Sequence, residues 1–153
     1  VKPLQEFIDQ ICEEIRTKEI RKEEVGKTAS TVAKYGKVRE KLVSLQQKIA
    51  SENDVIMDGR DIGTVVLPNA EVKIYLTASS RVRAERRYKE LQEKGETCDL
   101  DQIEKDIILR DEQDMNREIS PLRQADDAVL VDSSDMSIEE VVNCLIDIVE
   151  KAK

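Results

Sequence analysis

Two carboxylates and a guanidinium directly follow a short apolar run near the middle of this sequence. Residues 54–66 read DVIMDGRDIGTVV, so Asp58, Arg60 and Asp61 come just after Val55–Met57. A short continuous apolar run is typical of a buried parallel strand, and open α/β sheets bind ligands beyond the carboxyl ends of such strands. At that place Asp58 can hold Mg²⁺ directly or through water, and Arg60 can bind a phosphate through two N–H groups.

A plain turn explains the same residues. Asp-Gly is a strong turn signal, and the charges around Gly59 can simply be solvated. Taken alone, the motif slightly favours the turn.

A second group of charges lies at the end of a helix predicted over residues 99–117. The apolar stripe of this helix consists of Leu100, Ile103 and Ile107. Residues at the same helical spacing further along are charged: Arg110, Asp114 and Arg117. Two guanidinium groups flanking a carboxylate suit a nucleotide, with Arg on phosphate or base and Asp on a ribose hydroxyl. Ion pairs on an exposed helix end, worth a few tenths of a kcal/mol each, are the alternative.

A third cluster is positively charged within an acidic chain. Four arginines fall within seven residues: Arg81, Arg83, Arg86 and Arg87. Arg83 and Arg87 share a helix face and are suited to triphosphate oxygens. Pairing with Glu85 and Glu90 on an exposed helix explains the cluster about equally well.

The composition narrows the chemistry. The 153 residues carry a net charge of −8 and include no histidine, so imidazole acid–base chemistry and histidine metal sites are excluded. Phosphoryl transfer remains open, because it depends mostly on positioning and charge neutralisation. The negative charge disfavours a nucleic-acid surface, no apolar run is long enough for a membrane span, and the three scattered cysteines suit reduced thiols. We therefore expect a cytoplasmic protein that binds neither nucleic acid nor membrane.

Apolar periodicity predicts helices that alternate with short strands. Helices are expected over residues 3–16, 37–50, 80–94 and 99–117 and after Ser137, with another beginning in the charged stretch 17–27. Strands are expected at 55–57, 72–76 and 128–132, and residues 62–66 are expected to form a short helix or loop. This alternation predicts an α/β fold with a parallel sheet of about three strands, which is small for its helices.

Several segments resemble, in order, those of bacterial cytidylate kinases, which are P-loop nucleoside monophosphate kinases. They are VREKLVSLQQKIA, VIMDGRDIGTVVLPNAEVKIYLTAS, RAERRYKELQEKG, RDEQDMNREISPL and ADDAVLVDSS, and the resemblance runs from about Glu19 to the C-terminus. It implies a three-layer α/β/α fold of the P-loop kinase type, incomplete here. It also implies transfer of the ATP γ-phosphoryl group to CMP or dCMP with Mg²⁺, by a monomer.

The resemblance also implies a division of the chain and roles for its residues. It implies a helical monophosphate-binding segment at 1–50, core strands at 51–80, lid and nucleotide-binding helices at 81–120, and a core strand with the last helix at 121–153. The residues implied to bind CMP are Ser30, Arg39 and Asp61 at the base, Arg21 and Arg60 at phosphate, and Arg110, Asp114 and Arg117. Arg83 and Arg87 fall in the lid over ATP, and Asp58, Arg60 and Arg110 are the expected catalytic set.

One family feature does not occur in this sequence. The pattern GxxxxGK[ST], which cradles phosphates with backbone amides, is found nowhere in the 153 residues. The sequence thus resembles the C-terminal two-thirds of a cytidylate kinase, and we expect little or no turnover from it alone. A non-catalytic nucleotide-binding or interaction module derived from such a kinase is the alternative.

Overall fold

The computed structural model describes residues 23–32 and 35–152, which fall into two compact units, Val1–Leu45 and Gln46–Lys153. The helix predicted over 3–16 lies outside the described residues, as does most of the stretch 17–27. In the first unit, α2 spans Glu23–Val32. Helix α3, Gly36–Glu52, confirms the helix predicted over 37–50 and continues into the second unit.

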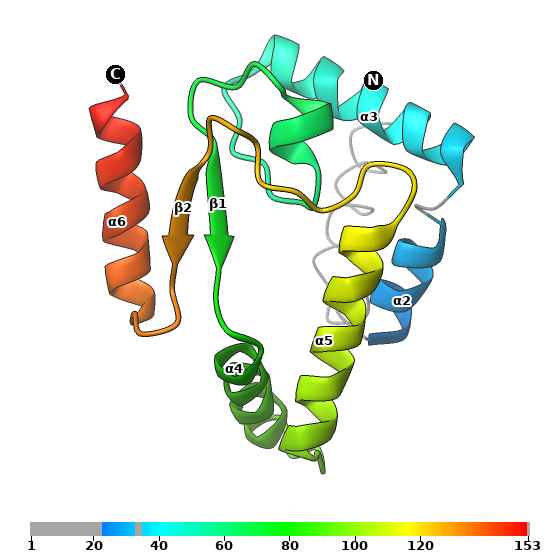
Figure 1. Ribbon diagram of the computed structural model, residues 1–153, viewed down its shortest axis with the longest axis vertical. Coiled ribbons are helices and arrows are strands. Elements are labelled where there is room, and N and C mark those ends of the chain that lie inside the picture. Colours follow the sequence, from blue (N-terminus) through cyan, green and yellow to red (C-terminus); the bar gives the residue numbers. More distant parts are fainter. Residues whose placement is uncertain (1–22, 33–34, 153) are drawn as a thin grey trace, which may run out of the picture. The chain divides into compact units, whose positions relative to one another are not determined.

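The second unit is built on a parallel sheet. Strand β1, Ile74–Thr77, pairs with β2, Val129–Asp132, in a register that places Ile74 opposite Val129 (Figure 1). The two strands are separated by helices α4 and α5, as a parallel connection requires. The predicted α/β fold with a parallel sheet is therefore confirmed.

The strand predicted at residues 55–57 does not form. Residues 54–58 have no regular secondary structure, and Ile56 is fully exposed at 103%. A run of three apolar residues cannot hold a strand conformation unless a neighbouring ladder supplies its hydrogen bonds. Among the described residues, the sheet has only the two strands β1 and β2.

The other predicted elements are present with small changes in their ends. Residues Ile62–Val66 form η2, a single π-helical turn, and α4 spans Ser80–Glu93 with the Ser79 side chain accepting from Val82 N. Gly95, at φ +77°, follows α4 in the left-handed conformation that favours glycine.

Helices α5 and α6 begin at side-chain caps. In α5, Leu100–Asn116, the Asp99 carboxylate accepts from Gln102 N. In α6, Ile138–Lys151, Ser137 and Glu140 form the predicted capping box. Each cap satisfies backbone N–H groups that have no partner within the helix.

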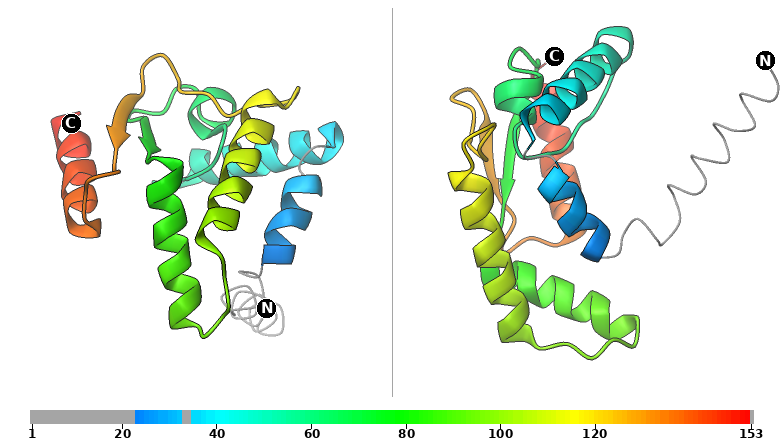
Figure 2. Two further views of the ribbon diagram at one scale, coloured as in Figure 1. Left: turned by 60° about the horizontal axis from the view of Figure 1, so that its bottom comes forward. Right: turned by 90° about the vertical axis from the view of Figure 1, so that its right-hand side faces the viewer.

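Helix α5 packs against α4, and the loop after Gly95 leads from the far end of α4 back to the start of α5 (Figure 2). Polar contacts link the first turns of the two helices: Arg81 Nη1 lies 2.9 Å from Asp101 Oδ1 and 3.0 Å from Glu104 Oε2, and Ser80 Oγ donates to Glu104. Together these contacts fix the angle at which α5 returns toward the sheet.

The apolar core of the described residues is small. Val66, Ala78, Ala84 and Val131 are the buried apolar residues, whereas apolar side chains on α6 and β2 remain exposed, among them Leu130 at 56% and Ile138 at 87%. In the described part of the chain, no helix has both the length and the apolar character needed to cross a membrane.

Candidate functional site

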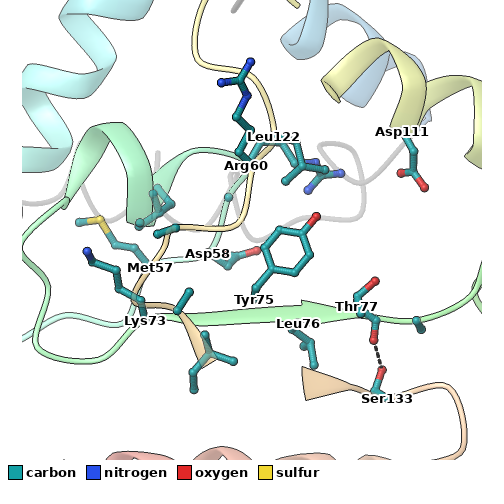
Figure 3. A pocket seen from close by; sticks show the side chains of 18 of the residues that line it. Met57, Asp58, Arg60, Lys73, Tyr75, Leu76, Thr77, Asp111, Leu122 and Ser133 are labelled. Carbon is teal, nitrogen blue, oxygen red and sulfur yellow. Dashed lines mark hydrogen bonds between the residues drawn. The ribbon is translucent and has the colours of Figure 1, made fainter. Parts of the chain in front are cut away.

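A cavity of about 660 Å³ lies beside β1 in the second unit. One wall is β1 itself, and another is the segment Met57–Arg60 (Figure 3). Arg83 and Arg86 of α4 and Asp111 of α5 also line it. The cavity therefore brings charged groups from several elements to the carboxyl end of a parallel strand, which is where α/β sheets bind ligands.

Three of the predicted site residues meet at the end of α5. Arg60 Nε donates to Asp114 Oδ2 over 2.9 Å, although the two residues are 54 positions apart in the chain. Arg117 Nη1 lies 4.0 Å from the other carboxylate oxygen, Oδ1. Asp114 is buried, with 10% of its side chain exposed, while Arg60 is 42% exposed. The buried carboxylate thus fixes Arg60 through a hydrogen bond and lies close to the guanidinium group of Arg117.

The backbone after α5 closes over this cluster. Helix α5 ends at Asn116, the backbone of the next residue, Arg117, is extended, and Ser120 adopts a positive φ of 52°. Leu122 N then donates to Asp114 O over 2.8 Å, and Arg117 Nε donates to Ser120 O. Arg117 Nη2 is buried and has no hydrogen-bond partner among the described residues. A buried donor of this kind is costly unless an acceptor reaches it.

A second guanidinium–carboxylate pair lies one turn earlier on α5. Arg83 binds Asp111 with both terminal nitrogens, at 3.1 and 2.5 Å, and its Nε donates to Ala78 O at the end of β1. The pair is partly buried, with 36% of the Arg83 side chain and 21% of the Asp111 side chain exposed. Arg83 therefore connects β1 to α5 and faces the cavity.

Arg86 fixes the loop that follows β2. Its Nη2 donates to Ser133 O over 2.6 Å, and Ser133 Oγ donates to Thr77 O over 3.0 Å (Figure 3). Ser133 thus joins the carboxyl ends of the two strands, and Arg86 of α4 holds Ser133 in place.

The two acids of the DGRD motif lie in different surroundings. Asp58 is exposed at the cavity wall, whereas Asp61 is buried at 3% and its carbonyl oxygen accepts from Val65 N and Val66 N at the start of η2. Gly59 between them needs its small size, because a Cβ there would lie 2.9 Å from Ile62 Cγ1. The motif is therefore a compact turn whose first acid faces the cavity.

Asp58 also fits a role near Mg²⁺. Within the described residues no cluster of three or more Asp, Glu, Cys or His side chains forms a metal cage. Mg²⁺ commonly keeps several waters and uses one or two carboxylates together with substrate phosphates, so a single exposed carboxylate is a suitable donor.

The remaining predicted residues lie apart from this cluster or outside the described residues. Arg110 is exposed on α5, and Arg87 Nη1 pairs with Glu90 on the same helix over 2.7 Å. Arg39 is half-buried on α3 within the first unit. Arg21 and the side chain of Ser30 lie outside what the structure describes. The roles predicted for these residues stay predictions.

Sequence reasoning did not single out Asp111. The less exposed face of α5 includes Ile107, Asp111 and buried Asp114. Asp111, four residues after Ile107, therefore lies on this face, whereas Arg110, three residues after Ile107, is exposed. The helical spacing that predicted Asp114 could also have identified Asp111, because both spacings of three and four residues place side chains on one face. Arg86 belongs to the predicted arginine cluster, but nothing in its spacing distinguished it from its neighbours.

Comparison of the sequence with known proteins identifies the family to which the chain belongs. The cytidylate kinase family model matches residues 6–151. The cytidylate kinase of Thermosipho africanus is 54% identical over 136 residues, which are 88% of this chain and 61% of that protein. Those of Desulforamulus reducens and Streptococcus pneumoniae are each 56% identical, over 90% and 82% of this chain and 62% and 56% of their own lengths.

The chain belongs to the cytidylate kinase family, as its sequence segments predicted. It spans about three-fifths of the length of these relatives. The small parallel sheet agrees with an incomplete α/β fold of the P-loop kinase type.

Proposed function

We propose that this member of the cytidylate kinase family carries the acceptor-binding part of an enzyme that transfers the γ-phosphoryl group of ATP to CMP or dCMP. The cluster of Arg60, Asp114 and Arg117 is the observation that supports the proposal most directly. A buried carboxylate is hydrogen-bonded to one guanidinium group and lies beside a second, and the second has a buried donor for which the described residues supply no acceptor.

The cluster is suited to a mononucleotide. Arg60 uses Nε for Asp114, which leaves the N–H groups of its terminal nitrogens for phosphate oxygens. Arg117 Nη2 is a further donor for the same ligand. An ionised carboxylate has about four lone-pair sites, so Asp114 can hold the two arginines and still accept from a ribose hydroxyl.

In the second unit, Asp61 is proposed as a base contact that accepts from the exocyclic amine of cytosine. The roles predicted for Arg39, as a donor to cytosine O2 or N3, and for Ser30 are kept as separate proposals. Uracil presents a carbonyl where cytosine has the amine. A carboxylate facing that position therefore favours CMP over UMP. Arg21 and Arg110 are proposed as further phosphate ligands.

The donor nucleotide is assigned to the other end of the cavity. Arg83 faces it, and Arg87 lies one turn further along α4. Asp58 would hold Mg²⁺ through water, and the ion, when bound, would neutralise charge on the phosphates. Arg60 and Arg110 are proposed to act on the phosphoryl group in transfer. Their positive charge would stabilise charge that develops there.

We further propose that this chain is a piece of a longer kinase. It spans about three-fifths of its relatives, and no glycine-rich phosphate loop of the pattern GxxxxGK[ST] occurs in it. A coupled assay with ATP, Mg²⁺ and CMP should therefore give essentially no turnover with this chain alone. Rapid turnover would contradict this part of the proposal.

Binding calorimetry tests the assignment of the acceptor. CMP should bind this chain more tightly than UMP, and Asp61→Asn should reduce that preference because an amide can donate as well as accept. Asp54→Asn is the matched control, since Asp54 is an exposed acid of the same segment with no assigned role. Equal affinity of the unaltered chain for CMP and UMP would refute the assignment of Asp61.

A further inference from the structure

The cavity beside β1 is positively charged, although the chain as a whole is acidic. Its lining includes five basic side chains and two acidic ones, whereas the 153 residues carry a net charge of −8. The basic residues are Arg60, Lys73, Arg83, Arg86 and Arg123, and the acidic ones are Asp58 and Asp111. A concave surface with one prevailing sign of charge attracts ligands of the opposite sign. The cavity therefore favours an anionic ligand.

Arg123 differs from the other basic residues of this lining, because the described part of the chain gives it no partner. Arg60, Lys73, Arg83 and Arg86 each donate a hydrogen bond to an acceptor in the chain. Arg123 is exposed at the cavity, and its guanidinium group has no hydrogen bond or ion pair with any of residues 23–32 and 35–152. All five of its N–H donors can therefore bind a ligand.

The backbone before Arg123 is anchored at the end of α5. Leu122 N donates to Asp114 O over 2.8 Å, and the Asp114 carboxylate accepts from Arg60 Nε over 2.9 Å. Arg123 thus follows directly after a residue that is tied to the partner of Arg60. This connection assigns Arg123 to the Arg60–Asp114–Arg117 cluster rather than to the end of the cavity that Arg83 faces.

Tyr75 directs a hydroxyl group into the same cavity. The side chain rises from the middle of β1 toward the side of the cavity on which Arg60 and Leu122 lie (Figure 3). Its hydroxyl has no hydrogen-bond partner among the described residues, whereas the Tyr88 hydroxyl accepts from Gln92 Nε2 over 2.9 Å. A partly enclosed tyrosine hydroxyl usually has a partner. A ligand in the cavity can supply one.

We propose that the Arg123 guanidinium and the Tyr75 hydroxyl are additional ligands of the phosphate group of the acceptor nucleotide. A phosphate monoester presents three strong acceptor oxygens, so Arg60, Arg123 and Tyr75 can all donate to it. Hydrogen bonds to such charged oxygens are stronger than those between neutral groups. The assignment rests on the proposed function for the identity of the nucleotide, but the recognition of phosphate does not depend on the base.

Binding calorimetry with CMP tests both residues. Tyr75→Phe removes only the hydroxyl, and Arg123→Gln removes the charge; each should weaken CMP binding about tenfold or more. The affinity for cytidine, which has no phosphate, should stay within about twofold. The midpoint of urea unfolding should be unchanged, because neither group has a partner among the described residues to lose. A structural role would instead lower the midpoint and affect both ligands.

Two control variants make the same chemical changes outside the cavity. Tyr88→Phe removes a hydroxyl from α4, and Lys105→Gln removes a positive charge from an exposed position of α5. Both should keep their affinity for CMP within about twofold. UMP provides a further control, because it carries the same phosphate. Tyr75→Phe and Arg123→Gln should weaken UMP and CMP equally, whereas Asp61→Asn should change their ratio.

Inorganic pyrophosphate separates this inference from the proposed function. If the acceptor is not CMP, the chain shows no preference for CMP over UMP, but Tyr75→Phe and Arg123→Gln should still weaken pyrophosphate binding at least fivefold. Affinities of the two variants for CMP and pyrophosphate that match those of the unaltered chain would overturn the inference. Equal losses for CMP and cytidine would also overturn it, since the contact would then not be with phosphate. Failure of the unaltered chain to bind either CMP or pyrophosphate would overturn it as well.

Discussion

Replacing Asp114 by asparagine separates the structural role of this carboxylate from its proposed role in nucleotide binding. Asp114 is buried, holds Arg60 Nε at 2.9 Å and lies 4.0 Å from Arg117 Nη1. Asparagine keeps the size of the side chain and one acceptor oxygen but removes the charge. Both guanidinium groups then face a neutral partner.

The expected loss of stability lies between the values for buried and exposed ion pairs. Removing one partner of a buried pair costs about 3–5 kcal/mol, whereas exposed pairs are worth about 0.2–1 kcal/mol. Asp114 is enclosed, but the side chain of Arg60 is 42% exposed and asparagine retains a hydrogen bond. We expect Asp114→Asn to lower the free energy of unfolding by about 2 kcal/mol.

The effect on CMP should accompany this loss but is measured separately. Urea unfolding gives the stability, and calorimetry gives the affinity for CMP. A tenfold or larger weakening of CMP binding, about 1.4 kcal/mol, is expected because the carboxylate no longer orients Arg60 and Arg117.

Asp111→Asn is the matched control for this experiment. Asp111 is an acid of the same helix that also holds an arginine, but its partner is Arg83 rather than Arg60. This variant should lose about 1–2 kcal/mol of stability and keep its affinity for CMP within twofold. The reasoning is refuted if Asp114→Asn binds CMP as tightly as the unaltered chain.

Three further predictions follow from named contacts. Arg117→Ala should weaken CMP binding by roughly 1.5–3 kcal/mol, the scale of a hydrogen bond to a charged group, and unchanged affinity in calorimetry would return this helix end to a purely structural role. Ser137→Ala should cost about 1 kcal/mol in urea unfolding, because the Ser137 hydroxyl caps α6; Ser44→Ala, at an exposed position within α3, serves as its control. The Ser137 backbone N–H and then its hydroxyl lower the pKa of Glu140 below the ordinary 4.5, so the stability that this carboxylate adds is complete above about pH 4.5 and is lost as the pH falls through the lowered pKa. Carboxyl NMR titration should show that lowered pKa, and a value at or above 4.5 would contradict the capping box.

Local patterns predicted the helices of the second unit well. Ser79, Asp99 and the pair Ser137–Glu140 are short-range signals, because each cap joins a side chain to a backbone group within three residues. Such contacts involve residues that are close together in the sequence, so they can be predicted without knowledge of the rest of the fold. The bounds of α4, α5 and α6 could therefore be predicted within a few residues.

The strand at residues 55–57 was predicted from the same kind of local signal and is wrong for this structure. A β-strand depends on a partner strand. The apolar composition of Val55–Met57 indicates only that burying these side chains would be favourable. Helices carry their own hydrogen bonds, whereas a strand needs a neighbour.

The candidate site was predictable only in part, for a related reason. Periodicity indicated that the end of α5 turns from apolar to charged, and Asp114 and Arg117 do lie inward there. It could not indicate that Arg60, 54 positions away, supplies the closest partner of Asp114. Nor could it separate Asp111 from Arg110, because the steps of three and four from Ile107 are equally helical.

The two carboxylates of α5 give the cavity an arrangement that suits the proposed reaction. Asp114 holds Arg60 and Asp111 holds Arg83, and three residues of helix separate the two acids by about 4.5 Å along the axis. Transfer between two nucleotides requires two phosphate-binding groups that are close together and fixed in position, since its catalysis depends mainly on positioning and charge. A helix is rigid over one turn, so α5 sets the spacing of the two acids that hold these arginines. In the longer kinase that we propose, neutralising either acid should therefore lower the rate of transfer more than it weakens the binding of the nucleotide held by the other arginine.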